Sequence, residues 1–231
     1  MVHTLSQASI NAAHDEEFLE LLVRSGCQGV LIGFESLDPK NLAAMGKGFN
    51  TMRGGYEVAL ANLRRHKLRL YATFVFGYDH DTPEAFDATV AFDATVAFAA
   101  TVAFAERHAF YMAAFNHLTP FPGTPLYERL ERAGRLRYER WWLDPAYAYN
   151  VIPFEPTGMS PEALQAGCLA ARRRFYSLAS IARRGVTATN RSSAFMWRNY
   201  YLINGMLRAE VAARDHYPLG DETDRQPLLP V

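Results

Sequence analysis

The stretch from Leu68 to Phe86, LRLYATFVFGYDHDTPEAF, constrains the fold more than any other part of the chain. The unbroken run from Tyr71 to Phe76 is typical of a parallel-sheet strand that is buried on both faces. Gly77 ends this run, and Thr82-Pro83-Glu84 then supplies a cap, a first-turn proline and an acidic first turn for a helix. A strand, a loop and a helix in this order predict a parallel α/β unit that binds ligands at the strand's carboxyl end.

Similar patterns predict about four parallel strands separated by helices, which is an α/β fold. The other strands are expected at Leu5 to Ile10, Gly29 to Phe34 and Phe110 to Leu118. Helices are expected at Ala13 to Ser25, after Asp38-Pro39, and at Thr51 to His66, Leu126 to Ala133, Ser160 to about Arg184 and Ser192 to Arg214. We therefore expect an α/β region at residues 1–135, a mostly helical region at 136–214 and a disordered tail at 215–231.

Composition excludes several classes of function. The net charge is zero over 231 residues, so nothing favours a nucleic-acid partner, and Arg172 to Arg174 with Arg183 and Arg184 are read as a solvated face. No apolar run reaches the roughly 20 residues of a membrane span, and no signal peptide opens the chain, so we expect a cytoplasmic protein. The seven histidines show no HxxxH or HExxH spacing, so no metal site is expected.

A repeat interrupts the helix that follows Thr82. Its units are FDATVA, FDATVA and FAATVA, with a period of six from Phe86. Six residues turn a helix by about 600°, so Phe86, Phe92 and Phe98 would point in three directions. We interpret the repeat as a tandem duplication within one helix, whose extra residues Phe92 to Ala103 overshoot the sheet and expose apolar surface.

Three loops follow three successive expected strands. They read Gly33-Phe34-Glu35-Ser36, then Phe76-Gly77-Tyr78-Asp79 with Asp81-Thr82-Pro83-Glu84, and then Leu118-Thr119-Pro120-Phe121-Pro122-Gly123-Thr124-Pro125-Leu126-Tyr127. In this order they resemble the ends of strands four to six of the radical S-adenosylmethionine (SAM) barrel, a TIM-like (β/α) barrel, in its cobalamin-binding branch. Met45-Gly46-Lys47 and Asn50 fit that branch, and Arg174-Phe175-Tyr176-Ser177 is similar to a C-terminal extension of some members.

The resemblance implies a SAM site at the strand ends. Glu35 and Ser36 match the position that contacts the ribose and methionine of SAM, and Phe76 and Gly77 match the backbone beside its adenine. Asn116, His117 and Pro120 would lie on the substrate side, although Asn116 and His117 are also consistent with plain core positions. Asp79 and Asp81 are expected to bond their own turn, and the aromatic run from Trp141 to Phe154 is expected to be core.

The cysteines depart from the family pattern. The family holds a 4Fe–4S cluster on a CxxxCxxC loop, whereas this chain has only Cys27 and Cys168, both expected to be small buried residues. We therefore expect the C-terminal part of a SAM-, iron–sulfur- and cobalamin-dependent enzyme whose N-terminal half is missing. Its parent would methylate or cyclise a small or lipid-like molecule, and the chain alone would make no adenosyl radical.

Two other classes stay open. The chain would be a non-catalytic remnant or partner module if its open sheet edges associate with another chain or with a second copy. A complete (β/α)-barrel aldolase is the third interpretation, but no lysine lies near the expected strand ends to form its Schiff base.

Deleting Phe92 to Ala103 should raise the melting temperature, because the remaining helix would no longer carry surplus apolar surface. Thermal unfolding followed by circular dichroism measures this. An unchanged or lower melting temperature would contradict the overshoot interpretation.

Overall fold

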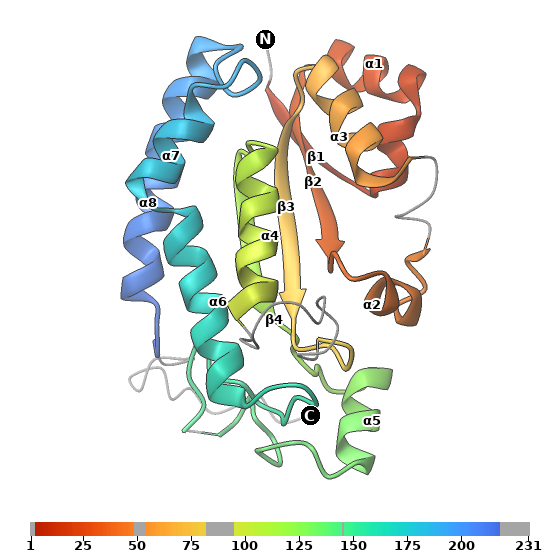
Figure 1. The fold of residues 1–231 in the computed structure, drawn as a ribbon, viewed down its shortest axis with the longest axis vertical. Coiled ribbons are helices and arrows are strands. Elements are labelled where there is room, and N and C mark those ends of the chain that lie inside the picture. Colours follow the sequence, from red (N-terminus) through yellow and green to blue (C-terminus); the bar gives the residue numbers. More distant parts are fainter. Residues whose placement is uncertain (1–2, 49–53, 82–94, 145, 218–231) are drawn as a thin grey trace, which may run out of the picture.

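A four-stranded parallel sheet forms the centre of the computed structural model (Figure 1), which describes residues 3–48, 54–81, 95–144 and 146–217. The strands lie in the order β1-β2-β3-β4. Their bounds are Thr4–Ala8 for β1, Cys27–Glu35 for β2, Arg69–Phe76 for β3 and Met112–His117 for β4. The predicted α/β class with four parallel strands and a helical C-terminal region is confirmed.

Most of the described helices begin at a side chain that caps the first turn. They are η1 (Ile10–His14), α1 (Glu16–Arg24), α2 (Pro39–Ala44), α3 (Gly55–Arg65), α4 (Thr95–Arg107), α5 (Pro125–Arg132), α6 (Pro161–Phe175), α7 (Leu178–Gly185) and α8 (Ala194–Ala213). Asp15, Asp38, Thr124 and Ser160 each accept a first-turn N–H, which satisfies a backbone donor that the helix itself leaves unpaired. The predicted start of a helix at Thr82, and the residues Asn50, Phe86 and Phe92, lie outside the described residues.

The sheet has one buried face and one half-buried face. Side chains such as Ile32, Phe74 and Phe115 alternate into the core beneath the helices. The intervening residues of β3, Tyr71, Thr73 and Val75, are only partly buried. The expected burial on both faces is therefore wrong, because within the described ranges the second face of β3 is not fully covered.

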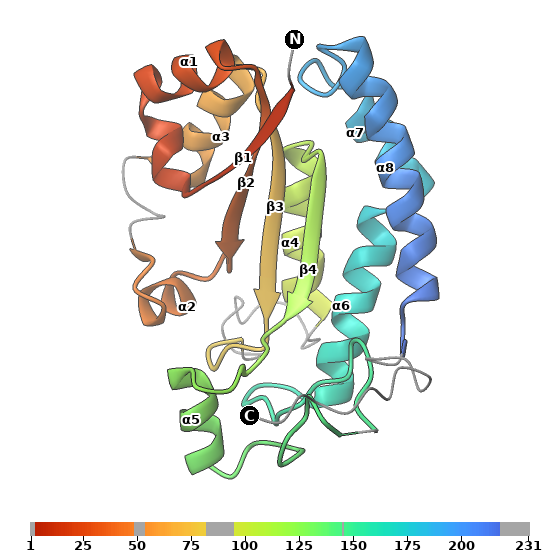
Figure 2. The ribbon, with the colours of Figure 1, turned by 180° about the vertical axis from the view of Figure 1, so that it is seen from behind.

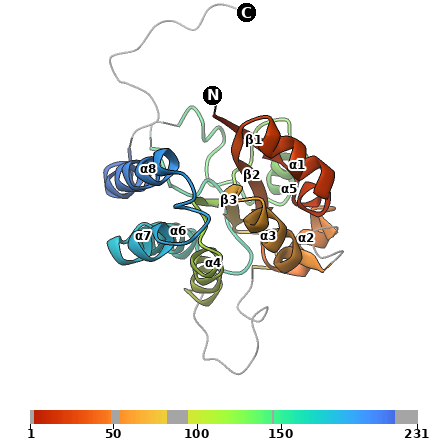
Figure 3. The same ribbon diagram turned by 90° about the horizontal axis from the view of Figure 1, so that it is seen from above.

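The C-terminal helices pack against the β4 side of the sheet. Helix α6 contacts both β4 and α4. Figure 3 shows α6, α7 and α8 on the side of the molecule away from α1 and α3. Hydrophobic residues of both regions, among them Phe115 and Phe175, share one core. The boundary expected near residue 135 stays a prediction.

The single helix expected from Ser160 to Arg184 is wrong, because two helices occupy this range. Helix α6 ends at Phe175, and Ser177 adopts an extended conformation and caps α7. The Ser177 hydroxyl accepts the N–H of Ser180 at 3.3 Å. A serine cap therefore breaks the helix where the sequence has neither glycine nor proline.

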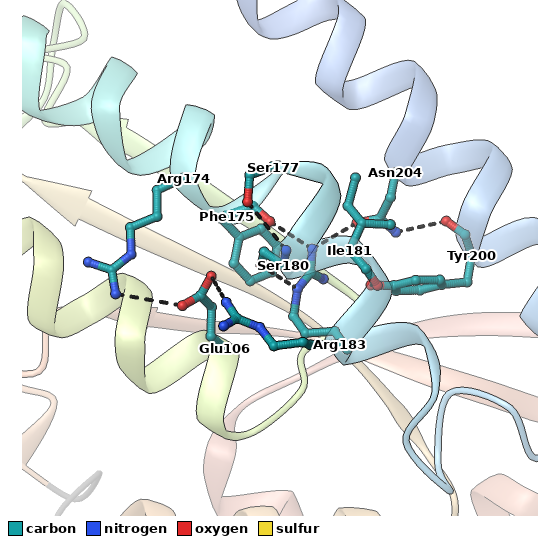
Figure 4. A network of polar contacts seen from close by, with 10 residues as sticks. Glu106, Arg174, Phe175, Ser177, Ser180, Ile181, Arg183, Tyr200 and Asn204 are labelled. Carbon is teal, nitrogen blue, oxygen red and sulfur yellow. Dashed lines mark hydrogen bonds and ion pairs between the residues drawn. The ribbon is translucent and has the colours of Figure 1, made fainter.

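The prediction that the arginines form a solvated face is also wrong for Arg172 and Arg184, because both lie in the core. Arg184 is 1% exposed and donates to the carbonyl oxygens of Phe110 and Phe175 at 2.7 and 2.9 Å. It also donates to Asn204 on α8 at 3.3 Å and lies over the Phe175 ring. Figure 4 shows Phe175 and Asn204 within this network of polar contacts. Arg184 thus joins α6, α7 and α8 to the chain that enters β4.

The last repeat unit belongs to the core. Phe98 is 4% exposed and packs on Phe76 with ring centroids 4.3 Å apart, and Val102 is fully buried. The expected exposure of the extra residues Phe92 to Ala103 is therefore wrong for Phe98 and Val102. The predicted gain in melting temperature then requires Phe86 and Val90 to take these two places in the deleted chain, as their spacing in the repeat allows.

Two further expectations are corrected or refined. Trp141, Tyr147 and Phe154 are core residues as predicted, but Trp142 and Tyr149 are exposed. The first residues of the expected disordered tail are held in place, since the Tyr149 N–H donates to the carbonyl of Tyr217 at 2.9 Å. Residues 218–231 lie outside the described residues.

Replacing Arg184 with methionine should lower the free energy of unfolding by about 3 kcal/mol, because buried carbonyl oxygens lose their donor. Chemical denaturation measures the change. Arg183→Met is the matched control, since Arg183 is exposed and its pair with Glu106 spans 3.5 Å, so we expect a change below about 0.5 kcal/mol. Equal effects of the two substitutions would contradict the role of Arg184.

Candidate functional site

The candidate site lies at the carboxyl ends of the strands. Figure 1 shows β2 and β3 pointing toward the end of the molecule that carries α2 and α5, and Figure 2 shows the same arrangement from behind. Parallel pairing aligns β2 with β3 and β3 with β4, where Phe76 pairs with His117. The loops that carry the predicted site residues therefore emerge at the same edge of the sheet.

Glu35 adopts an unusual backbone conformation at the end of β2. Its φ is 62°, and the strand register shifts between Gly33 and Glu35. The left-handed region is uncommon for a residue with a side chain and occurs at functional sites. The Glu35 carboxylate accepts a hydrogen bond from Lys47 Nζ at 2.7 Å, and a Cβ atom at Gly33 would collide with it. Gly33 thus leaves room for this carboxylate.

Ser36 lies next to Glu35 but is buried. Its hydroxyl oxygen accepts the N–H of Asp38 at 3.1 Å, and its carbonyl accepts the hydroxyl of Tyr56 at 3.4 Å. The side chain therefore shapes the turn into α2. Direct contact of Ser36 with SAM stays a prediction.

Phe76 and Gly77 present backbone at the end of β3. The Phe76 ring faces the core, and its carbonyl accepts the N–H of Leu118 at 2.8 Å. Gly77 has a φ of 101°, and a Cβ atom there would lie 2.8 Å from Leu164, so only glycine fits. The Gly77 N–H already donates to Asp81, so an adenine contact would have to use other backbone groups.

The two aspartates of this loop differ in role. Asp81 accepts the N–H groups of Gly77 and Tyr78 at 2.8 and 3.0 Å, which confirms the predicted turn role. Asp79 instead pairs with Arg129 and Arg135 and accepts the Thr157 hydroxyl, so its predicted turn role is wrong.

Asn116, His117 and Pro120 follow β4. Asn116 is exposed and accepts a hydrogen bond from Arg172 at 3.3 Å. The His117 Nδ1 lies 2.9 Å from the carbonyl of Leu118, and burial lowers the pKa of His117, which favours the neutral ring. The Pro120 carbonyl accepts the indole N–H of Trp141 at 2.9 Å. Only Asn116 is exposed, and the substrate role of all three stays a prediction.

Two cavities lie along the half-buried face of the sheet. One of about 350 Å³ has both polar and apolar walls, which include Asn116, Tyr149 and Arg172. The other, of about 260 Å³, is nearly all apolar and is lined by Leu31, Tyr71 and residues of α8. Small-molecule sites are usually about 300–1,000 Å³, so the larger cavity has the size of a ligand site.

Sequence reasoning missed the partners that hold these loops. Lys47 was noted only as part of a motif, yet it pairs with Glu35. Asn41 was not singled out, yet it is 1% exposed and donates to Asp81 at 2.5 Å. A polar residue on the first turn of a helix that follows a loop gave no signal of a partner 40 residues away.

The cysteines do not fit an iron–sulfur cluster. Cys27 and Cys168 are both buried, and burial raises the pKa of the Cys168 thiol to about 12, so it does not supply a thiolate. Within the described ranges, no group of three histidine, cysteine or acidic residues could hold a metal ion. Among the described helices, none has the length and apolar character to cross a membrane.

The fold and these loops define an α/β protein with a candidate ligand site at its strand ends, and comparisons with known proteins extend this description. No family model matches the chain. Bacteriochlorophyllide d C-12(1)-methyltransferase of Chlorobaculum tepidum is 32% identical over 200 residues, which are 87% of this chain and 39% of that protein. The chain is therefore homologous to a methyltransferase over most of its length.

Other relatives match shorter parts. Bacteriochlorophyllide d C-8(2)-methyltransferase of the same organism is 29% identical, over 58% of this chain and 27% of that protein. Hopanoid C-2 methylase of Rhodopseudomonas palustris is also 29% identical, over 58% of this chain and 23% of that protein. The chain thus spans less than half the length of these curated relatives.

A solved structure also aligns with the chain. It is the radical S-adenosylmethionine methyltransferase TsrM of Kitasatospora setae, with cobalamin and a 4Fe–4S cluster bound. The TM-score is 0.45 at 17% identity, over 93% of this chain and 45% of that one.

Asp79→Asn should destabilise the protein at pH 7 by about 1 kcal/mol, the scale of a partly exposed ion pair. Burial alone would raise the pKa of Asp79, but hydrogen bonds from Arg129, Arg135 and Thr157 hold it below its ordinary value. The carboxylate therefore adds stability above its unfolded pKa of about 3.9, and this stability is lost as pH falls through the lower folded value. As the pH falls below about 4, the free energies of unfolding of the two proteins, measured by urea denaturation between pH 7 and pH 2, should draw closer together.

Glu20→Gln replaces an exposed residue of α1 and is the control. Its free energy of unfolding should stay close to that of the parent at every pH. A difference between Asp79→Asn and the parent that does not depend on pH would contradict the ionic role of Asp79.

Proposed function

We propose that this chain is the C-terminal part of a cobalamin-dependent radical SAM methyltransferase and contributes the strand ends that contact SAM. The observation that carries the proposal is the meeting of the Glu35 loop and the Gly77 loop at adjacent strand ends, in a chain homologous to methyltransferases. The same two loops carry the motifs that resemble the radical SAM barrel.

The residues present fit part of a SAM site. The Glu35 carboxylate is half-buried and Lys47 orients it, so it can accept hydrogen bonds from a ribose diol or an ammonium group. Gly77 allows close approach of a planar base to the backbone. When bound, SAM supplies the methyl group of the transfer, and Glu35, Ser36, Phe76 and Gly77 would bind and orient it.

The iron–sulfur cluster does not fit this chain, because two separate buried cysteines cannot hold it. In the proposal, the cluster ligands and the cobalamin site lie on polypeptide outside this sequence, and the chain alone is inactive. The substrate class in the proposal is a small or lipid-like molecule. The apolar cavity beside Tyr71 and Leu31 lies near the beginning of β3, not at the strand ends that carry Glu35 and Gly77.

A second candidate is a non-catalytic module that associates through the sheet edges. Strands β1 and β4 are the two edges of the sheet, and Leu5 on β1 is 66% exposed. Edge strands are templates for pairing with another chain, or with a second copy of the same chain.

Titration of the purified chain with S-adenosylhomocysteine, followed by calorimetry, tests the first candidate. We expect binding that Glu35→Gln weakens about tenfold, because a charge-assisted hydrogen bond is lost. Glu17→Gln on α1, at the opposite end of the sheet in Figure 1, is the control and should bind like the parent.

Size-exclusion chromatography of the same sample separates the two candidates. A monomer that binds S-adenosylhomocysteine supports the SAM site. An oligomer that does not bind it supports the partner module and contradicts the SAM site.

A further inference from the structure

We infer that Asn41 and Asp81 form a positioning pair that holds the loop after β3 in register with the Glu35-Ser36 loop. This inference rests on the proposed function, because the two loops are the ones assigned to SAM. It adds two residues that touch no ligand and act through the backbone and side chains of the binding loops.

Asp81 fixes the backbone at the end of β3. It is 7% exposed, and one carboxylate oxygen, Oδ2, accepts the N–H groups of Gly77 and Tyr78 at 2.8 and 3.0 Å. The Asp81 N–H donates to the carbonyl of Tyr78 at 3.0 Å and closes the turn. The conformation of Gly77 is therefore set by a side chain four residues later in the sequence.

Asn41 links this turn to the other loop. It lies in α2, and its amide Nδ2 donates to Asp81 Oδ1 at 2.5 Å and to the hydroxyl oxygen of Ser36 at 3.4 Å. One amide nitrogen thus contacts both loops. Since Asp38 caps the same helix and its N–H donates to Ser36, hydrogen bonds also join α2 to the Ser36 turn.

Within the pair, Asn41 is the hydrogen-bond donor and Asp81 is the acceptor. Asp81 accepts hydrogen bonds from three neutral N–H groups, those of Gly77, Tyr78 and Asn41. The Asn41 Oδ1 is buried and has no hydrogen-bond partner among the described residues. A buried carboxylate is costly, and an apolar pair would fill the same space at lower cost. What the polar pair adds is one fixed orientation of one loop relative to the other.

Exchanging the two side chains tests the inference. In Asn41→Asp, two carboxylates would face each other, so we expect S-adenosylhomocysteine to bind at least tenfold more weakly at pH 8. Asp81→Asn should have a smaller effect, because Asn41 can turn its amide and present Oδ1 to the new donor. The double variant restores one donor and one acceptor in exchanged positions and should bind within about threefold of the parent.

A ligand-free measurement accompanies the titration. Amide hydrogen exchange at Gly77 and Tyr78 should become faster in Asn41→Asp and return toward the parent rate in the double variant. Asn62→Asp is the matched control for a general loss of stability. Asn62 is a partly buried asparagine that donates to the carbonyl of Ala13 at 2.8 Å, and its substitution should leave the affinity unchanged.

The outcomes separate the inference from the proposed function. A folded double variant that restores neither affinity nor exchange overturns the positioning pair. If Asn41→Asp fails to fold, the double variant still decides when compared with the parent, because much faster exchange at Gly77 and Tyr78 in the double variant overturns the pair. If the parent does not bind S-adenosylhomocysteine but the exchange rates follow the expected order, the proposed function is wrong and the pairing of the loops is upheld.

Discussion

The in-register parallel pairing of β2, β3 and β4 is the constraint on which the rest of the structure depends. Parallel strands end at the same edge of the sheet, so the pairing of Phe76 with His117 and of Glu35 with Phe74 decides which loops are neighbours. The shift at Glu35 is the one irregularity within the β2–β3 ladder, and it turns that carboxylate toward Gly33 and Lys47. The strand pairing therefore determines which loops form the candidate site, whatever side chains those loops carry.

The C-terminal helices are attached to this sheet by buried cations that bind carbonyl oxygens. Arg172 donates to the carbonyl of Phe115 in β4 at 2.9 Å, and Arg184 donates to the carbonyl of Phe110 just before it. Arg184 also donates to the last residue of α6, Phe175, where the helix dipole favours a positive charge. Such contacts fix the angle of a helix on a strand more tightly than apolar packing alone, because a guanidinium group bonds in one plane.

The architecture could be predicted from local patterns, because apolar runs, caps and glycine stops act over a few residues. The strand that ends at Phe76 and the helix expected from Ser192 to Arg214 are two examples. The burial of Arg172 and Arg184 could not be predicted, because adjacent arginines on a helix are typical of an exposed face. Several of their partners are backbone carbonyls, which leave no trace in the sequence. The break at Ser177 was missed because a capping serine is also common within helices.

The candidate site, too, could be predicted only in part. Motif spacing located Glu35 and Gly77, whereas the contacts that hold them come from Lys47, Asn41 and Asp81.

These three contacts all lie between β2 and the loop after β3, whereas Asp79 of the same loop is held by Arg129, Arg135 and Thr157 farther along the chain. Lys47 and Asn41 both come from the segment that follows β2 and act on the ends of β2 and β3. A site that is preorganised by contacts within this chain can keep its shape although the chain spans only 39% of a related methyltransferase. Under the proposed function, recognition of SAM and the redox chemistry that acts on it are then separable in the polypeptide. Recognition depends on local hydrogen bonds, whereas the redox step requires thiolates that the two buried cysteines of this chain do not provide.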